Sequence, residues 1–364
     1  MKKSSLIIYV LVLALLAPFT WLDGAPKSKT KQIGIATYSV KGLESDIEGS
    51  LKALGEYGYN VMEISNYNAG RGNVAGYSPA DYAALAEKYG LDIISSHARA
   101  KFDVKDTPGT LEAWGKVFDD HKTMGCKYVV FPMNMWSSDV ETLKAECNLM
   151  NLIGAEANKR GIKFGYHNHS FEFAIVPGTS LTFEDFLIQN TDADKVFFQL
   201  DVYWIKVGGQ DPVAYLKKYP GRFSVLHIKD DYVIGESGKI DFKPIFKQFY
   251  KNGHKDWFVE MEAKMTEEQR QQSIAMMDNM KQRLSQGGQQ GQQQGPPQGQ
   301  AGQRQGQPQG QAGAPPQGGQ RQGGAPAGAG FGQRDHQAQA AMLKESLEGI
   351  RLSAGYLLNA KFVK

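Results

Sequence analysis

Eight short runs of apolar, β-branched and aromatic residues recur along the chain, and their regular spacing is the strongest constraint on its fold. Their starts lie about 26 to 35 residues apart, and segments of helical periodicity such as Val140–Arg160 separate most of them. Strands that alternate with helices pair in parallel, and eight such units close a barrel. We therefore predict an α/β fold, a (β/α)8 TIM barrel, with strands at Ile33–Thr37, Val61–Ser65, Ile93–His97, Tyr128–Met133, Lys163–His169, Phe197–Asp201, Phe223–His227 and Trp257–Glu262.

An open, doubly wound parallel sheet is the alternative arrangement of the same elements. No Gly-x-Gly-x-x-Gly turn follows the first run, and eight is the strand number of the barrel. Runs such as Tyr128–Phe131 are continuously apolar, which is typical of strands covered on both faces. The barrel is therefore favoured.

The N-terminus has the pattern of an export signal. Lys2 and Lys3 precede an apolar run, Leu6–Leu16, which is followed by a helix-breaking proline and by small residues at Gly24 and Ala25. We predict that residues 1–25 are a signal peptide, so that the protein is periplasmic or secreted and has no stable membrane span after cleavage. An uncleaved membrane anchor is the alternative.

One segment interrupts the strand–helix rhythm. Residues 286–330 are almost entirely Gln, Gly, Pro and Ala and contain no aromatic residue, so they cannot bury a core and we expect them to be disordered. The polar stretch Thr266–Leu284 precedes this tract and is predicted to be a surface helix. The barrel then comprises residues 32–264 and 341–364, and residues 265–340 form an insertion between strand eight and helix eight.

Composition excludes several classes of protein. The chain has 41 Lys and Arg against 38 Asp and Glu, a net charge of +3, which offers no electrostatic footprint for a nucleic acid. Cys126 and Cys147 are the two cysteines, too few for a disulfide scaffold. We predict no nucleic-acid partner and a fold stabilised by its core.

Ionisable residues follow most of the predicted strands at the barrel end where active sites of this fold lie. Charged groups are expensive to bury unless they pair or bind a metal, so their convergence indicates a site rather than packing. The residues are Glu63, His97, His167, His169, Glu172, Asp201, His227, Lys229, Glu260 and Glu262.

Three carboxylates and one imidazole that converge from strands five to eight would form a metal site. Such hard oxygen ligands suit one divalent ion, Mn2+, Co2+, Mg2+ or Zn2+. A metal ion there could hold two adjacent oxygens of a sugar and stabilise an enediolate, while flanking carboxylates move the proton. This chemistry names no particular sugar.

Four segments of the chain resemble the xylose-isomerase-like TIM-barrel superfamily and, within it, the sugar phosphate isomerase/epimerase group. They are Gly165–Phe173, Gln199–Trp204, Gly208–Pro212 and Leu226–Asp230. The resemblance implies one divalent metal held by Glu172, Asp201, His227 and Glu260. It also implies that His97, His167, His169 and Lys229 face the substrate.

These residues have distinct expected roles. Glu172 and Glu260 would transfer the carbon-bound proton, and Lys229 would offer a positive charge to the enediolate. His167 and His169 would bind or protonate hydroxyl groups. The remaining contacts to the substrate are assigned to His97, Glu63 and Trp204.

We expect an exported, metal-dependent sugar isomerase or epimerase that works by proton abstraction beside a carbonyl. The substrate would be a small sugar, a keto-sugar or a glycoside, and an oligomer is compatible with the sequence. A 3-keto-glycoside lyase or hydratase is the alternative enzyme, and a noncatalytic carbohydrate-binding protein is the alternative of another class. Trp204 stands where the apurinic-site endonucleases of this fold place a metal-binding histidine, which disfavours a nuclease.

Overall fold

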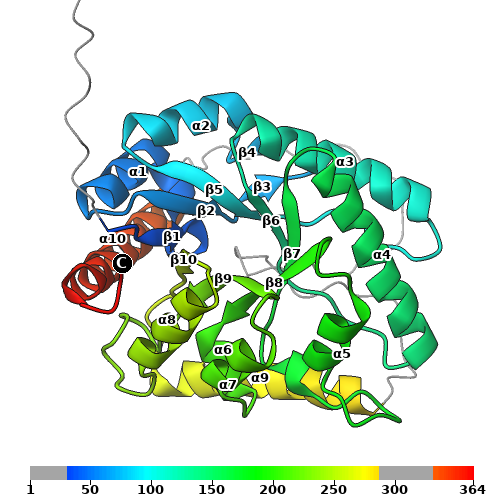
Figure 1. Cartoon of the computed structure of the whole chain (residues 1–364). Helices are drawn as coiled ribbons and strands as arrows, with labels where there is room; N and C mark the ends of the chain where they lie inside the picture. Colours follow the sequence, from blue (N-terminus) through cyan, green and yellow to red (C-terminus); the bar gives the residue numbers. More distant parts are fainter. Residues whose placement is uncertain (1–30, 287–330) are drawn as a thin grey trace, which may run out of the picture. The chain divides into compact units, whose positions relative to one another are not determined.

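Eight parallel strands close into a barrel in the computed structural model, which describes residues 31–286 and 331–364 (Figure 1). Around the barrel the order is β1, β10, β9, β8, β7, β6, β5 and β2, and the pairing of Ile35 with Val259 closes it. The prediction of a TIM barrel is confirmed. The strands are β1 (Gly34–Ala36), β2 (Val61–Ile64), β5 (Asp92–His97), β6 (Tyr128–Phe131), β7 (Lys163–His167), β8 (Val196–Asp201), β9 (Phe223–Ile228) and β10 (Asp256–Val259).

The predicted signal peptide, residues 1–25, lies outside the described residues. So does most of the predicted low-complexity tract, residues 287–330.

Helices surround the barrel (Figure 1). Most begin at an Asp, Ser or Thr whose side chain accepts a backbone N–H of the first turn, which satisfies one of the free donors there. These helices are α1 (Ile47–Glu56), α2 (Pro79–Lys88), α3 (Thr107–Thr123), α4 (Val140–Asn158), α5 (Phe183–Asn190), α6 (Val202–Val207), α7 (Pro212–Lys218) and α8 (Phe242–Lys251). A small hairpin, β3 (Tyr67–Asn68) with β4 (Asn73–Val74), follows β2.

Two further helices flank the undescribed tract. Helix α9 (Glu267–Ser285) begins with a capping box at Thr266 and contacts η3 (Phe171–Phe173), the short helix after β7. Helix α10 (Phe331–Asn359) begins earlier than the expected residue 341 and packs against α1. Across the two described ranges, none of the helices has the length and apolar character to cross a membrane.

The barrel interior is apolar at one end and polar at the other. Glu63 on β2 hydrogen-bonds Gln199 on β8 and His227 on β9, strands that are not neighbours of β2, so all three side chains must point into the closed barrel. Residues that alternate with these along the same strands share the inward face. A separate buried cluster that includes Phe197 and Phe258 fills the interior below the polar layer.

We expect Gly165→Ala to reduce the free energy of unfolding by about 1–3 kcal/mol, the cost of overpacking a filled core. A Cβ atom at Gly165 would lie 2.5 Å from the Phe197 ring, which fills the barrel interior. Gly221→Ala is the matched control because its Cβ would meet nothing within 4 Å. Urea unfolding of both variants checks the prediction, and equal stabilities would contradict it.

Candidate metal centre and active site

Along each strand that contributes to the site, every second side chain faces inward, and these inward side chains change from apolar to polar or ionisable toward the carboxyl end of the strand. On β8 the inward residues are Phe197, Gln199 and Asp201, and on β9 His227 is followed by Lys229. Because side chains two apart share a face, the ionisable groups meet at the carboxyl ends of the strands. This end of the barrel therefore carries the candidate site.

Four buried side chains form a potential metal-binding cluster. His167, Asp201, His227 and Glu260 each offer one ligand atom, and these atoms all lie within 4.8 Å of one another. The four come from the ends of β7, β8 and β9 and from just beyond β10. Two imidazoles and two carboxylates form a mixed nitrogen and oxygen donor set, which suits a divalent ion such as Zn2+, Mn2+ or Co2+.

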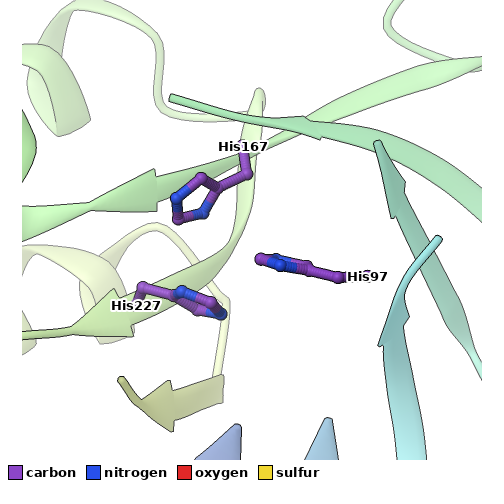
Figure 2. A group of neighbouring side chains, drawn as sticks. All are labelled: His97, His167 and His227. Carbon is purple, nitrogen blue, oxygen red and sulfur yellow. The ribbon is translucent and has the colours of Figure 1, made fainter. Parts of the chain in front are cut away.

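Three imidazole rings point toward one another inside the barrel (Figure 2). His97 stacks on His227 with the ring centroids 5.0 Å apart, and His167 meets His227 edge-on at 4.7 Å. His97 is also the partly exposed member of this group. His97 is therefore accessible from the site, and its contact with substrate stays a prediction.

Glu63 orients the His227 ring. Its Oε1 lies 2.6 Å from Nε2 of His227, and its Oε2 accepts hydrogen bonds from Ser95 and Gln199 at 2.7 and 2.8 Å. A proton on Nε2 of His227 leaves Nδ1 with a free lone pair, 2.9 Å from Oε2 of Glu260. This is the carboxylate–histidine pattern that presents an imidazole to a metal.

The prediction that Glu63 binds substrate is therefore corrected. Its side chain is fully buried, and both of its oxygens are occupied by protein donors. Glu63 holds the ring of His227 in place, and the burial that would raise its pKa is outweighed by His97 and His227, which bring the pKa to about 2.

Gln199 orients His167 in the same way. Its Oε1 lies 3.0 Å from Nδ1 of His167 and 2.7 Å from Nε2 of His97. An amide oxygen only accepts, so Nδ1 of His167 is the donor and Nε2 keeps its lone pair. Burial lowers the pKa of His167 well below its ordinary value, which keeps the ring neutral and able to bind a metal.

Asp201 divides its two carboxylate oxygens between the fold and the site. Oδ1 accepts the backbone N–H groups of Tyr203 and Trp204, both at 2.8 Å, and so caps α6. Oδ2 is buried and finds no hydrogen-bond partner in the described part of the chain. Nδ1 of His227 is buried and faces Oε2 of Glu260 at 2.9 Å. An unpartnered carboxylate oxygen beside an imidazole–carboxylate pair fits a metal ion that neutralises and coordinates these atoms.

Protons would compete with a metal ion for the same atoms. Burial raises the pKa of Asp201 to about 7, and the neighbouring Glu260 adds to that rise against the opposing charge of Lys229. Burial alone would lower the pKa of His227, but the carboxylates of Glu63 and Glu260 outweigh the effect of burial and raise this pKa to about 10. Metal binding at this cluster must therefore release protons.

Glu172 is not brought into the cluster, which corrects its prediction as a metal ligand. Strand β7 ends at His167, and η3 turns the Glu172 side chain into a fully buried pocket of its own. There Oε1 accepts the Tyr166 hydroxyl at 2.5 Å and Oε2 accepts the His169 N–H at 2.8 Å. The Tyr166 oxygen in turn accepts from Asn134 N–H and Trp136 Nε1–H, both at 3.1 Å. Glu172 thus braces the loop that carries His169.

His169 and Trp204 form one wall of the site. The His169 ring stacks on Phe171 and lies 5.9 Å from the ring of Trp204. Its Nδ1 is buried and has no hydrogen-bond partner among the residues that the structure describes, so it is available to a ligand. Burial lowers the pKa of His169 to about 3, so the ring is neutral.

Lys229 lies between two carboxylates. Its Nζ donates to Oε1 of Glu260 at 2.8 Å and to Oε1 of Glu262 at 2.6 Å, and it lies 5.2 Å above the ring of Trp204. The ammonium is almost completely buried, and the two carboxylates hold its pKa well above the ordinary value in spite of that burial. Lys229 is thus a permanently charged group beside Glu260.

Sequence reasoning missed three residues of this end of the barrel. Gln199 is uncharged and was passed over, although it precedes Asp201 by two residues and so shares its face. Tyr38 and Lys41 follow β1, where no ionisable residue comes directly after the strand. The Tyr38 hydroxyl donates to Glu262 at 2.9 Å, and the Lys41 ammonium lies 3.7 Å from the same carboxylate.

The closed barrel and its buried cluster of histidines and carboxylates define a TIM-barrel protein with a candidate active site at the carboxyl ends of the strands. The family model described as xylose isomerase-like TIM barrel matches residues 51–280. The chain belongs to this family.

Similar proteins include a sugar phosphate isomerase/epimerase from Parabacteroides distasonis. Its crystal structure superposes with a TM-score of 0.66 at 28% identity, over 93% of this chain and 98% of that one. An inosose dehydratase from Geobacillus kaustophilus is 24% identical over 281 residues, which is 63% of this chain and 86% of the relative.

A second inosose dehydratase, from Clostridium beijerinckii, is 28% identical over 134 residues, 30% of this chain. The match spans 43% of the length of that relative.

We expect the buried position of Glu172 to make stability fall with rising pH. Burial raises the pKa of this carboxyl from 4.5 to about 8, so the folded chain holds the proton more tightly than the unfolded chain. The resulting stabilisation is complete below pH 4.5 and is lost as pH rises through 8; it is on the order of 5 kcal/mol. Glu172→Gln removes this dependence.

Urea unfolding with chelator, at several pH values between 4.5 and 9, measures the effect as the difference between wild type and Glu172→Gln. The difference cancels other titrating groups. Glu141→Gln is the matched control because it makes the same substitution at an exposed position on α4, outside the buried pocket. A Glu172→Gln difference that is constant across the range would contradict the expectation.

Proposed function

We propose that this protein is a divalent-metal-dependent enzyme that removes a proton from the carbon beside a carbonyl group of a sugar or sugar-like ring. The observation that carries the proposal is the buried cluster of His167, Asp201, His227 and Glu260, in which Oδ2 of Asp201 has no hydrogen-bond partner among the described residues. A bound divalent ion would polarise the substrate carbonyl and so acidify the neighbouring C–H bond. A pure binding protein has no need of such a buried acid–base cluster.

Two outcomes of this proton abstraction are supported by different relatives. Return of the proton gives isomerisation or epimerisation, in line with the name of the Parabacteroides distasonis protein, which matches nearly the whole chain. Loss of an oxygen substituent from the next carbon gives elimination, in line with the inosose dehydratases. The second outcome includes a 3-keto-glycoside lyase or hydratase, whose ketone also acidifies the neighbouring C–H bond.

Glu260 is the carboxylate best placed to receive the proton. Lys229 and His227 hold its pKa well below the ordinary value despite its burial, so the carboxylate is ionised. Lys229 stays charged beside it and can stabilise developing negative charge on a substrate oxygen. His169 and His97 offer neutral imidazole groups to substrate hydroxyls. Glu172, assigned this proton transfer from the sequence, acts instead through the loop that it braces.

Export and the kind of partner remain part of the proposal. The N-terminal signal pattern supports a location in the periplasm or outside the cell, where free sugars and glycosides would be more accessible than phosphorylated sugars. We therefore propose a small sugar, a keto-sugar or a glycoside as substrate, and no nucleic-acid partner.

We expect Asp201→Asn to lose bound metal while the barrel stays folded. Asparagine keeps an Oδ1 that can cap α6 but removes the negative charge of the ligand atom. The loss of affinity should exceed the about 10–100-fold that outer-sphere residues cause. Asp211→Asn is the matched control because Asp211 caps α7 outside the cluster. Elemental analysis after dialysis against Mn2+ or Zn2+ measures retention, and stoichiometric metal in Asp201→Asn would contradict the site.

We expect solvent deuterium to enter the carbon beside the carbonyl when the enzyme acts in D2O. Free ketoses, aldoses and 3-keto-glycosides are tested as substrates, with Mn2+, Co2+, Mg2+ or Zn2+ returned to chelated enzyme. Glu260→Gln should abolish both turnover and incorporation, whereas Glu172→Gln should retain incorporation because Glu172 lies outside the cluster. Product that forms without cleavage of that C–H bond would disprove the mechanism, and sugar binding without turnover would favour a binding protein.

A further inference from the structure

A row of contacts leads from the metal cluster to the surface between β10 and β1. Glu260 accepts from Lys229, Lys229 also donates to Glu262, and Glu262 accepts from Tyr38. Exposure rises along the row: the side chain of Lys229 is 1% exposed, that of Glu262 is 20% exposed, and Tyr38 is 43% exposed. The row therefore links the buried cluster to the surface of the barrel.

Tyr38 is exposed but held in place. It lies within η1 (Thr37–Ser39), and the Ser39 hydroxyl anchors this turn to β10 by accepting from Met261 N–H at 2.9 Å. Its hydroxyl is fixed on Glu262, and the Lys41 ammonium lies 3.5 Å from the ring centroid. A fixed aromatic ring offers apolar area at a low cost in conformational entropy.

The Lys41 ammonium has N–H groups that could donate hydrogen bonds to a ligand. Its ammonium carries three N–H donors, and its 3.7 Å separation from Glu262 is beyond normal hydrogen-bond length. The side chain is only 16% exposed, so the group is partly removed from water. The ammonium covers one face of the Tyr38 ring, so the ring offers the apolar area that the ammonium leaves uncovered, next to a donor and an acceptor.

We propose that Tyr38, Lys41 and Glu262 form an outer subsite that binds the second sugar ring of a glycoside whose first ring lies at the metal cluster. The proposal rests on the proposed function for the position of the first ring. The C–H face of a pyranose would pack on Tyr38, and its hydroxyls would bind Lys41 and Glu262. The substrate class is then a disaccharide or longer glycoside rather than a free monosaccharide.

Calorimetric titration of Mn2+-loaded enzyme with glucose, maltose and cellobiose tests the subsite. We expect at least one disaccharide to bind about tenfold more tightly than glucose, in line with the contribution of one aromatic contact. Tyr38→Ala should remove that advantage and change glucose affinity less than about twofold. Tyr356→Ala is the matched control, since Tyr356 is a similarly exposed tyrosine on α10, and should keep the advantage.

Lys41→Met separates the polar from the apolar contribution. It should weaken binding of the disaccharide but not of 4-nitrophenyl glucoside, whose aromatic ring can pack on Tyr38 without hydroxyls. Equal affinity of wild type for glucose and both disaccharides would overturn the proposal. The proposal would also be overturned if Tyr38→Ala still bound the disaccharide more tightly than glucose by the wild-type factor, or if it lost affinity for glucose and the disaccharide by the same factor.

Turnover of 3-ketoglucose and of the 3-keto forms of both disaccharides is measured separately. A Tyr38-dependent affinity without turnover of any compound would support the subsite and reject the proposed function. Turnover of any of these compounds, together with disaccharide affinity that does not depend on Tyr38, would support the proposed function and reject the subsite.

Discussion

The hydrogen bond between Glu63 and His227 is the interaction on which the rest of the site depends. A carboxylate that is completely removed from solvent is stable only if it is paired, and Glu63 is paired with His227, Ser95 and Gln199 at once. Through His227 it selects which ring nitrogen faces Glu260. Through Gln199 it is linked to the rings of the other two histidines. One carboxylate on β2 thereby sets the orientation of donors that come from strands on the far side of the barrel.

This arrangement explains how a site of opposite charges can stay buried. His227 has Nε2 on Glu63 and Nδ1 facing Glu260, and His167 has Nδ1 on Gln199, so each of these two rings has one nitrogen fixed by an interior acceptor. The two carboxylate neighbours of His227 raise its pKa to about 10, so both ring nitrogens carry a proton at neutral pH. On the proposed metal site, a bound cation would replace one of these protons. The neighbouring carboxylates would then face a positive charge in both cases, from the protonated ring or from the cation.

Much of the fold could be predicted from the sequence, because eight runs of similar spacing leave few other topologies. Asp201, His227 and Glu260 could also be predicted, since each lies at or just past the end of a strand and the fold brings those ends together. Glu172 could not be placed by the same reasoning, because β7 ends at His167 and alternation along a strand says nothing about a residue in the following turn. His167 was expected to face the substrate, but its position at the strand end makes it the fourth member of the cluster. Gln199 could not be found by a search for ionisable residues, because its side chain is a neutral amide that connects Glu63 with the histidines.

Asp201 performs two tasks with one carboxylate, since Oδ1 caps α6 while Oδ2 faces the cluster. The backbone of α6 therefore helps to determine where a ligand oxygen lies, and the position is reached as soon as the helix forms. Two requirements consequently restrict substitutions at this position. The side chain must cap α6, and it must present a negatively charged oxygen to the cluster. Asparagine meets the capping requirement but not the charge requirement, so on the proposed metal site a homologue that carries it would retain the barrel and bind no cation. On that proposal, the residue at this position distinguishes metal-binding barrels from others, even where the overall sequence has diverged.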